Sequence, residues 1–322
     1  MRRILSLCLS VGLGGIFSVL AGCITINLPP PPGPLEEEVL SGTADAKVLL
    51  VDLSGVIGSK EVRGIYRRPG QVAGIKEVLT VAAEDDDVKA VVVRVNSPGG
   101  TVTASDVLYH ELRSFKEKHK IPVVASIMDL GTSGGYYVAS AADQIVAHPS
   151  SVTGSIGVIM LTVDASGLLE RIGVETNAVA SGPKKGMGSP LRPMTAEERE
   201  IFQSVIDSFY ERFVDVVRQG RPRLNAEQVR TLADGRIYSG IQARELGLVD
   251  EVGYLEDAIE LAKNAAGLKE AKVVTYHRPG EYRHNIYSSF LGGGAALAQL
   301  SNLDAMTLLR SGTPQFMYLW MP

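Results

Sequence analysis

The sequence predicts an α/β fold with a mostly parallel sheet flanked by helices. Short apolar segments rich in valine, isoleucine and alanine are typical of buried strands, and they lie at residues 47–58, 89–100, 122–128 and 144–149. Segments with helical spacing of apolar residues separate the first three of these predicted strands. Strands that alternate with helices in this way form βαβ crossovers, so most neighbouring strands should be parallel.

The helices are predicted from apolar residues that recur every three or four positions. They are expected at residues 71–84, 105–118 and 134–142. The longest helix should begin after Thr195, because Thr195 and Glu198 have the spacing of a capping box.

The end of the predicted domain repeats the same alternation. Residues 236–253 should form a turn, a short helix and a strand, and residues 255–267 should form a last helix closed by Gly267.

Composition sets limits on the class of protein. The 322 residues are 45% hydrophobic and 21% charged, which is enough for one large or two small domains with a core. A net charge of −4 gives no basic surface for nucleic acid. Cys8 and Cys23 are the two cysteines, both near the N-terminus, so the rest of the chain has no disulfide framework or cysteine-ligated zinc site.

The N-terminus has the pattern of an export signal. Two arginines precede an uncharged run from Ile4 to Gly22, and residues 1–22 are predicted to be the signal peptide. The ending Leu-Ala-Gly-Cys resembles the lipobox of bacterial lipoproteins, which implies lipidation of Cys23. An uncleaved membrane anchor is the alternative, because about 20 apolar residues can span a bilayer. Either way the chain is expected to be exported and tethered to a membrane of the cell envelope.

Residues 23–46 are predicted to be the lipid anchor and a proline-rich linker. The segment PPPPGP at residues 29–34 favours a stiff polyproline spacer, and the acids at residues 36–38 should keep it solvated. The folded domain is therefore expected to begin near Lys47.

Three glycine-bearing segments are candidates for a functional site, at residues 98–100, 131–135 and 153–157. The first two follow predicted strands, and ligands of open parallel sheets bind at the carboxyl ends of strands. None of the three has the spacing of a Walker A or dinucleotide-binding motif, which argues against a nucleotide site.

Ser133 lies at a strand-to-helix turn, which is the position of a nucleophile elbow. There the Gly134 N–H could face a developing oxyanion, and Gly100 is a candidate for the second donor. The alternative is that Ser133 simply caps the helix. These residues alone leave both interpretations open.

The base that would activate Ser133 is also left open by the residues alone. His148 follows a strand and is the only histidine expected near the glycines, although a histidine before proline is commonly a turn residue. A desolvated lysine can serve instead, and Lys184 and Lys185 lie in a loop rich in glycine and proline. Ordinary solvation of two surface lysines is the alternative.

Five segments, in this order, resemble the signal peptide peptidases of the SppA type, serine peptidase family S49. They are VNSPGGTVTASD (95–106), GTSGGYYVASAADQIVA (131–147), VTGSIGV (152–158), SGPKKGMGSPLRPMTAEER (181–199) and GRIYSGIQARELGLVDEVG (235–253). The resemblance covers residues 47–267, which are predicted to be the peptidase domain.

This resemblance implies a ClpP/crotonase-like α/β fold and a Ser-Lys dyad. It assigns Ser133 as the nucleophile and Lys185 as the general base, Gly100 and Gly134 as the oxyanion donors, and Ser155 as a partner that orients the lysine.

At the lysine the chain departs from the family pattern. Family members often carry Tyr-Lys-Asp, where this chain has Lys184-Lys185-Gly186.

The resemblance also implies an assembly and a substrate class. It implies a homo-oligomer, an octamer, in which neighbouring protomers supply the serine and the lysine of one site. The expected substrates are cleaved signal peptides and other apolar peptides at the membrane. Neither a metal nor a cofactor is required.

Two other function classes are compatible with these features. One is a crotonase-type enzyme acting on a CoA thioester, and the other is a catalytically silent membrane scaffold. The C-terminal extension, residues 268–322, lies outside the resemblance and ends in an apolar tail. It is expected to pack on the core or an interface, and the alternative is that it lies in the substrate groove.

Overall fold

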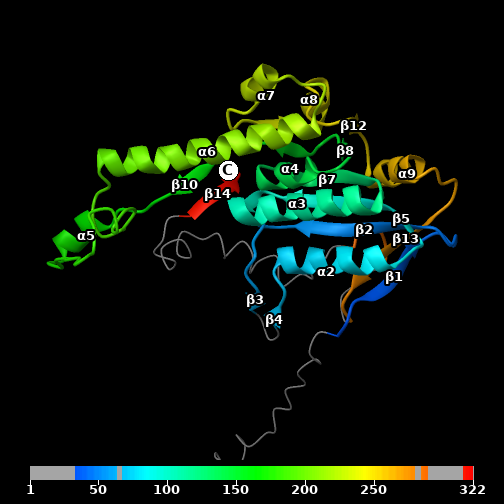
Figure 1. Cartoon of the computed structure of the whole chain (residues 1–322), viewed down its shortest axis with the longest axis horizontal. Coiled ribbons are helices and arrows are strands. Elements are labelled where there is room, and N and C mark those ends of the chain that lie inside the picture. Colours follow the sequence, from blue (N-terminus) through cyan, green and yellow to red (C-terminus); the bar gives the residue numbers. More distant parts are fainter. Residues whose placement is uncertain (1–32, 64–66, 280–283, 289–314, 322) are drawn as a thin grey trace, which may run out of the picture. The chain divides into compact units, whose positions relative to one another are not determined.

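The computed structural model describes residues 33–63, 67–279, 284–288 and 315–321 (Figure 1). The predicted signal peptide and Cys23 lie outside the described residues. None of the helices in the described part combines the length and the apolar character that crossing a membrane requires.

In the described part of the chain, nine strands form one sheet. Its order is β1 (Glu36–Ser41), β13 (Lys272–His277), β2 (Lys47–Ser54), β5 (Val88–Ser97), β7 (Val123–Thr132), β8 (Gln144–Ala147) and β12 (Glu251–Val252), while β9 (Val152–Gly154) pairs with β7 and β11 (Ile237–Ser239) with β9. Only the β1–β13 and β11–β9 pairs among these are antiparallel. The predicted α/β class with a mostly parallel sheet is confirmed.

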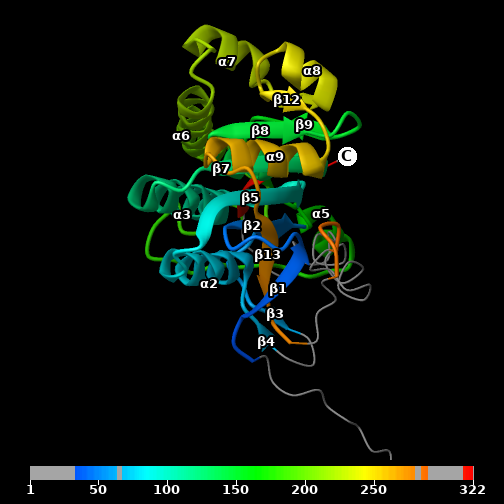
Figure 2. The ribbon, with the colours of Figure 1, turned by 90° about the vertical axis from the view of Figure 1, so that its right-hand side faces the viewer.

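Helices cover both faces of this sheet (Figure 2). One face packs against α2 (Gln71–Glu84), α3 (Val102–His119), α4 (Gly134–Ala139) and the end of α6 (Ala196–Gly220), and the other against α9 (Leu255–Ala265). Strand side chains alternate between the faces, so Leu49 and Val51 join the first core while Val48 and Leu50 join the second. The predicted helices are present, and α3 begins earlier than expected. The capping box of Thr195 and Glu198 at the start of α6 is confirmed.

Smaller elements complete the described fold. The short helices α7 (Ala226–Leu232) and α8 (Gly240–Glu245) flank β11, and β3 (Val62–Arg63) pairs with β4 (Arg67–Arg68). A second sheet has the order β10 (Ile159–Leu161), β14 (Gln315–Leu319) and β6 (Gly99–Thr101), and both of its pairs are antiparallel.

The folded part begins earlier than predicted, at Glu36 instead of Lys47. Strand β1 pairs with β13 in the stretch expected to be solvated linker. The reason lies partly in Lys47, whose buried ammonium group forms ion pairs with Glu37 at 2.8 Å and Asp85 at 2.7 Å. An acidic segment is thus held against the sheet by a buried cation that needs carboxylates.

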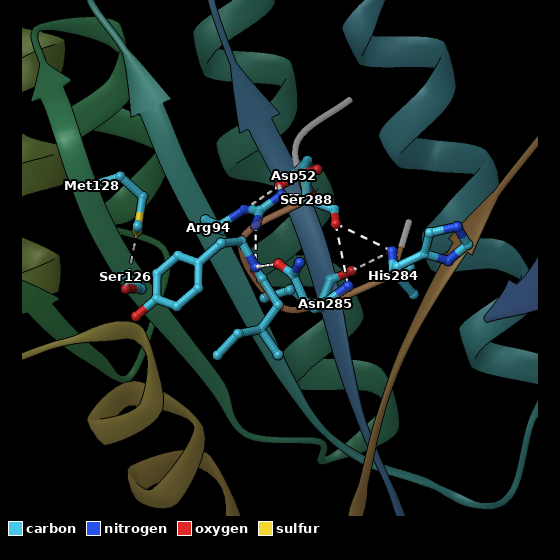
Figure 3. A network of polar contacts seen from close by, with 11 residues as sticks. Asp52, Arg94, Ser126, Met128, His284, Asn285 and Ser288 are labelled. Carbon is cyan, nitrogen blue, oxygen red and sulfur yellow. Dashed lines mark hydrogen bonds and ion pairs between the residues drawn. The ribbon is translucent and has the colours of Figure 1, made fainter. Parts of the chain in front are cut away.

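The chain after β13 is fastened to the α9 face of the sheet by Arg94 (Figure 3). Arg94 lies on β5, is 4% exposed, and forms an ion pair with Asp52 of β2 at 2.5 Å. Its guanidinium also donates to the carbonyl oxygens of Ile286 and Ser288. The Ser288 hydroxyl accepts from the backbone N–H of His284 at 3.1 Å, which closes the turn.

Residues 157–197, here called the arm, contain no buried residue. The arm includes β10, α5 (Ser166–Arg171) and the loop before α6. Figure 1 shows α5 and the start of α6 well apart from α4. Except for Glu198, no residue of α6 before Phe213 is buried. The arm nevertheless exposes several large apolar side chains, namely Val163, Leu168, Ile172, Val174, Val179 and Leu191.

Candidate active site

Ser133 occupies a strained turn between β7 and α4. Its backbone has φ 51° and ψ −116°, a conformation that L-residues rarely adopt. The Ser133 N–H donates to the Gly154 carbonyl at 2.8 Å, and its carbonyl accepts from the Tyr137 N–H at 2.8 Å. Two fully buried tyrosines, Tyr136 and Tyr137, fix α4 in the core, and the Tyr136 hydroxyl donates to the Leu248 carbonyl at 2.6 Å. The surrounding structure therefore enforces the strain.

The helix-cap interpretation of Ser133 is wrong, because its hydroxyl makes no capping hydrogen bond to α4. Within the described residues this hydroxyl has no hydrogen-bond partner, although the residue is only 1% exposed. Because this hydroxyl neither caps α4 nor bonds to another described group, it is available to react.

The backbone amides of Gly100 and Gly134 converge beside Ser133. Ile57 bonds to the residues on either side of Gly100, donating to the Gly99 carbonyl at 2.8 Å and accepting from the Thr101 N–H at 3.0 Å. The N–H of Gly100 therefore points away from Ile57. Gly134 is the first residue of α4, so its N–H has no partner within the helix.

Side chains cannot replace these glycines. An ideal Cβ on Gly100 would lie 2.0 Å from the Ile57 carbonyl oxygen. An ideal Cβ on Gly134 would lie 3.1 Å from the Gly100 nitrogen, which also shows how close the two amides are. The pair can accept an oxyanion from an attack by Ser133.

Ser155 is the second strained serine of this region. It has φ 50°, is 7% exposed, and follows Gly154, whose carbonyl holds the Ser133 N–H. Apart from these two serines, the one described non-glycine residue with a positive φ is Lys120, which ends α3. Ser155 also lines a groove of about 460 Å³. The sequence motif indicated Ser155 as a candidate site residue. Nothing in the sequence predicted that its backbone would be strained.

His148 is not brought to Ser133. Its Nδ1 lies 2.7 Å from the Ser150 Oγ, and its ring stacks edge-on against Tyr254 with the centroids 4.7 Å apart. It is the turn residue that a histidine before proline commonly is.

Lys184 and Lys185 both lie on the arm. Lys184 forms an ion pair with Glu197, whereas the exposed Lys185 side chain has no ion-pair or hydrogen-bond partner among the described residues. The structure brings Ser133, Gly100, Gly134 and Ser155 together and leaves Lys185 on a separate part of the chain.

Arg192 holds the loop that carries Lys185, a role that the sequence did not reveal. Its guanidinium donates to the Gly186 carbonyl at 3.0 Å and to Glu198 at the start of α6 at 3.0 Å. The Arg192 guanidinium lowers the pKa of Glu198 to about 2, from an ordinary value of 4.5. The contact should therefore persist above pH 4.5 and be lost as the pH falls toward 2.

On the expected role of Lys185 as the base, replacing Arg192 with glutamine should lower kcat about tenfold with little change in KM, because a loosened loop would misplace the base but remove no substrate contact. Steady-state kinetics on a peptide substrate measure both constants. Arg199→Gln is the control, since Arg199 is an exposed cation on α6, the helix that carries Glu198. An unchanged kcat in Arg192→Gln would show that this contact does not position the base.

Comparison with known proteins decides the family. The sequence model of the family described as "Peptidase family S49" matches residues 115–269. A protein of Enterococcus faecium named "Putative signal peptide peptidase SppA" is 36% identical over 296 residues, which cover 88% of this chain and 84% of that protein. The chain belongs to peptidase family S49. As a member of family S49 it is a serine peptidase, which confirms the enzyme class predicted from the sequence.

Further similarities were found in both comparisons. "Serine protease SPPA, chloroplastic" of Arabidopsis thaliana is 31% identical over 278 residues, covering 79% of this chain and 40% of that protein. Among solved structures, the "1510-N membrane-bound stomatin-specific protease S97A mutant" aligns with a TM-score of 0.44 and 15% identity, over 68% of this chain and 85% of that chain.

Proposed function

We propose that this S49 peptidase is a membrane-tethered serine endopeptidase with a Ser133–Lys185 dyad. Its substrates are cleaved signal peptides and other apolar peptides at the membrane. The name of the Enterococcus relative supports the substrate class. The observation that carries the proposal is the strained Ser133, whose hydroxyl has no hydrogen-bond partner among the described residues, beside the amides of Gly100 and Gly134.

The proposed reaction uses these groups in order. Neutral Lys185 takes the Ser133 proton as the serine oxygen attacks the peptide carbonyl, and the Gly100 and Gly134 amides stabilise the oxyanion. The resulting lysinium protonates the leaving amine. Water then hydrolyses the acyl-enzyme and frees Ser133. Ser155 is proposed to orient the lysine, because its strained backbone adjoins the residue that holds Ser133.

The lysine is proposed to come from a neighbouring protomer in a homo-oligomer, an octamer. A lysine acts as a base when it is neutral, which requires that it be shielded from water. Lys185 is exposed within one chain, so a second copy is needed to cover it. The arm that bears it has no buried residue and exposes Leu168 and Ile172 at 63% each, as expected of a surface that another protomer covers.

The tether is proposed to be the N-terminal segment of an exported chain. Residues 1–22 would direct export, and lipidated Cys23 would hold the domain at a membrane of the cell envelope. Mass spectrometry of the envelope-derived protein should find a lipid-modified N-terminal Cys23. An intact apolar segment in its place would support the uncleaved anchor.

A mixing experiment tests the dyad and its origin together. Ser133→Ala and Lys185→Ala should each abolish cleavage of an apolar peptide by the homogeneous oligomer. Coexpressed at equal amounts, they should recover about a quarter of wild-type activity, because a random quarter of the sites would pair an intact serine with an intact lysine.

The outcomes separate the alternatives. If both catalytic residues came from one chain, every site in the mixture would carry a defect and no activity would return. Lys184→Ala is the matched control for the adjacent lysine and should retain cleavage. Cleavage that survives in either homogeneous variant would exclude the Ser133–Lys185 dyad.

A further inference from the structure

Ser97 is the last residue of β5 and lies three positions before Gly100. Its side chain is fully buried, and its hydroxyl is hydrogen-bonded both as a donor and as an acceptor. The hydroxyl donates to the Gly55 carbonyl at 2.6 Å and accepts from the Gly99 N–H at 3.0 Å. A single hydroxyl therefore joins the loop after β2 to the glycine turn that carries Gly100.

The pattern of β5 does not explain a serine at this position. Val91, Val93 and Val95 alternate along the strand and pack in the first core. Position 97 continues that face, because alternate residues of a strand point to the same side. Packing alone would favour another apolar residue there. Ser97 breaks the pattern where the strand meets the candidate site, and such breaks are expected at functional sites.

Gly99 is held at both of its backbone polar groups. Its N–H bonds to the Ser97 hydroxyl, and its carbonyl accepts from the Ile57 N–H at 2.8 Å. Its φ of 101° is one that glycine adopts without strain. The Gly99 carbonyl and the Gly100 N–H belong to one planar peptide group, so fixing the first fixes the direction of the second. By holding the Gly99 turn, Ser97 helps to set where the Gly100 N–H points.

Ser97 also secures the loop that carries Ile57. Gly55 lies two residues before Ile57, and its N–H donates to the Asn96 carbonyl at 2.9 Å. The Gly55 carbonyl accepts from the Ser97 hydroxyl, so both polar groups of Gly55 are bonded to the end of β5. Loss of the Ser97 hydroxyl would release the Gly55 carbonyl and the Gly99 N–H together.

The second candidate donor lies against the same turn. An ideal Cβ on Gly99 would lie 2.7 Å from the Gly134 nitrogen, and one on Gly135 would lie 2.8 Å from the Ser97 carbonyl oxygen. Contacts this close mean that a shift of the Gly99 turn would move one donor relative to the other. The separation of the two amides thus depends on the turn that Ser97 holds.

We infer that Ser97 is a positioning residue for the oxyanion donors. Its hydroxyl is occupied by Gly55 and Gly99, so it acts through the Gly100 amide and not on the substrate. This inference rests on the proposed function, in which Ser133 attacks and Gly100 donates. An oxyanion donor is effective because it is in place before the charge develops. Ser97 therefore contributes to stabilisation of the transition state and not to substrate affinity.

Kinetics of full-length variants test this role. Ser97→Ala should lower kcat for an apolar peptide about 10- to 100-fold and leave KM within about twofold, because a misdirected donor weakens only the transition state. Ser97→Thr and Ser97→Val separate the hydroxyl from packing, since the two new side chains have nearly the same shape and the first keeps a hydroxyl. Ser97→Thr should retain most of the wild-type kcat, and Ser97→Val should lose as much as Ser97→Ala. Equal kcat in Ser97→Thr and Ser97→Val would overturn the inference.

A transition-state mimic gives a readout that loss of stability alone would not change. A peptide aldehyde reacts when the Ser133 oxygen bonds to the aldehyde carbon, the carbonyl electrons pass to the aldehyde oxygen, and the serine proton passes to Lys185. The new oxyanion then lies at Gly100 and Gly134. Ser97→Ala should weaken aldehyde inhibition by the same factor as kcat/KM, whereas the matching peptide alcohol, which forms no adduct, should bind as it does to the wild type. Unchanged aldehyde inhibition, or equal weakening of the aldehyde and the alcohol, would overturn the inference.

Thr275→Val is the matched control. It removes a buried hydroxyl that donates to the Leu50 carbonyl at 3.1 Å, on β13, which is separated from β5 by β2. It should lower the free energy of unfolding without changing kcat or aldehyde inhibition. If Ser97→Thr or Ser97→Val does not fold, Ser97→Ala and the aldehyde still decide.

Ser133→Ala separates this inference from the proposed function. An active Ser133→Ala enzyme would overturn the proposed function and, with it, the role of Ser97. An inactive Ser133→Ala enzyme beside a fully active Ser97→Ala enzyme would overturn the role of Ser97 alone.

Discussion

Replacing Ser133 with glycine is expected to abolish peptidase activity and to stabilise the fold. Loss of the proposed nucleophile should lower kcat about a millionfold, as in other enzymes whose activated serine is removed. The backbone at φ 51° strains a serine but not a glycine. Relief of about 1–3 kcal/mol, less the entropy that glycine adds to the unfolded chain, leaves a net gain of about 1 kcal/mol. Denaturant unfolding and peptide kinetics on the same preparation measure both effects.

Two further variants identify the cause of each effect. Ser133→Ala removes the proposed nucleophile and keeps the strain, so it should be inactive without being stabilised. Lys120→Gly relieves a positive φ of 58° at the exposed end of α3, so it should gain stability and keep full activity. A destabilised Ser133→Gly protein would mean that the turn does not strain the serine.

Replacing Arg94 with methionine is expected to cost about 3–5 kcal/mol of unfolding free energy, because it breaks a buried ion pair with Asp52. It also releases two backbone carbonyls of residues 284–288. The chain around these residues should therefore become more sensitive to limited proteolysis. Denaturant unfolding measures the loss, and mass spectrometry of the fragments locates the cleavage.

Two comparisons check this explanation. The double variant Arg94→Met, Asp52→Leu should recover part of the loss, because it also removes the carboxylate that Arg94 pairs with but leaves the released carbonyls. Arg218→Met removes a half-exposed ion pair with Asp215 and should cost less than about 1 kcal/mol. Equal losses of unfolding free energy in Arg94→Met and Arg218→Met would show that burial of the Arg94–Asp52 pair adds nothing to stability.

The elements of the main sheet could be predicted because their side chains repeat with the period of the structure. Strands β2, β5 and β7 are apolar runs, and the spacing in α2 is that of an amphipathic helix. Strand β1 could not be predicted, because three consecutive glutamates indicate a segment that is exposed to solvent. Only the three-dimensional structure shows that one of them, Glu37, meets the buried Lys47.

Only part of the candidate site could be predicted from the sequence. Ser133 and Gly134 follow from the strand-to-helix turn, and Gly100 from its place after a strand. The residues alone did not choose among His148, Lys184 and Lys185, and the resemblance to family S49 made the choice. The place of β14 could not be predicted, because an apolar stretch such as FMYLW contains no signal for which strands it joins.

The arm has a consequence for when the enzyme can work. On the proposed assignment, a newly exported chain has a serine with two oxyanion donors but lacks its base until it meets another copy. Catalytic competence would then depend on protein concentration, and dilution would act as a safeguard against premature proteolysis. Attachment to a membrane confines the chains to two dimensions and raises their effective concentration. The anchor would thus govern the onset of activity as well as the location of the enzyme.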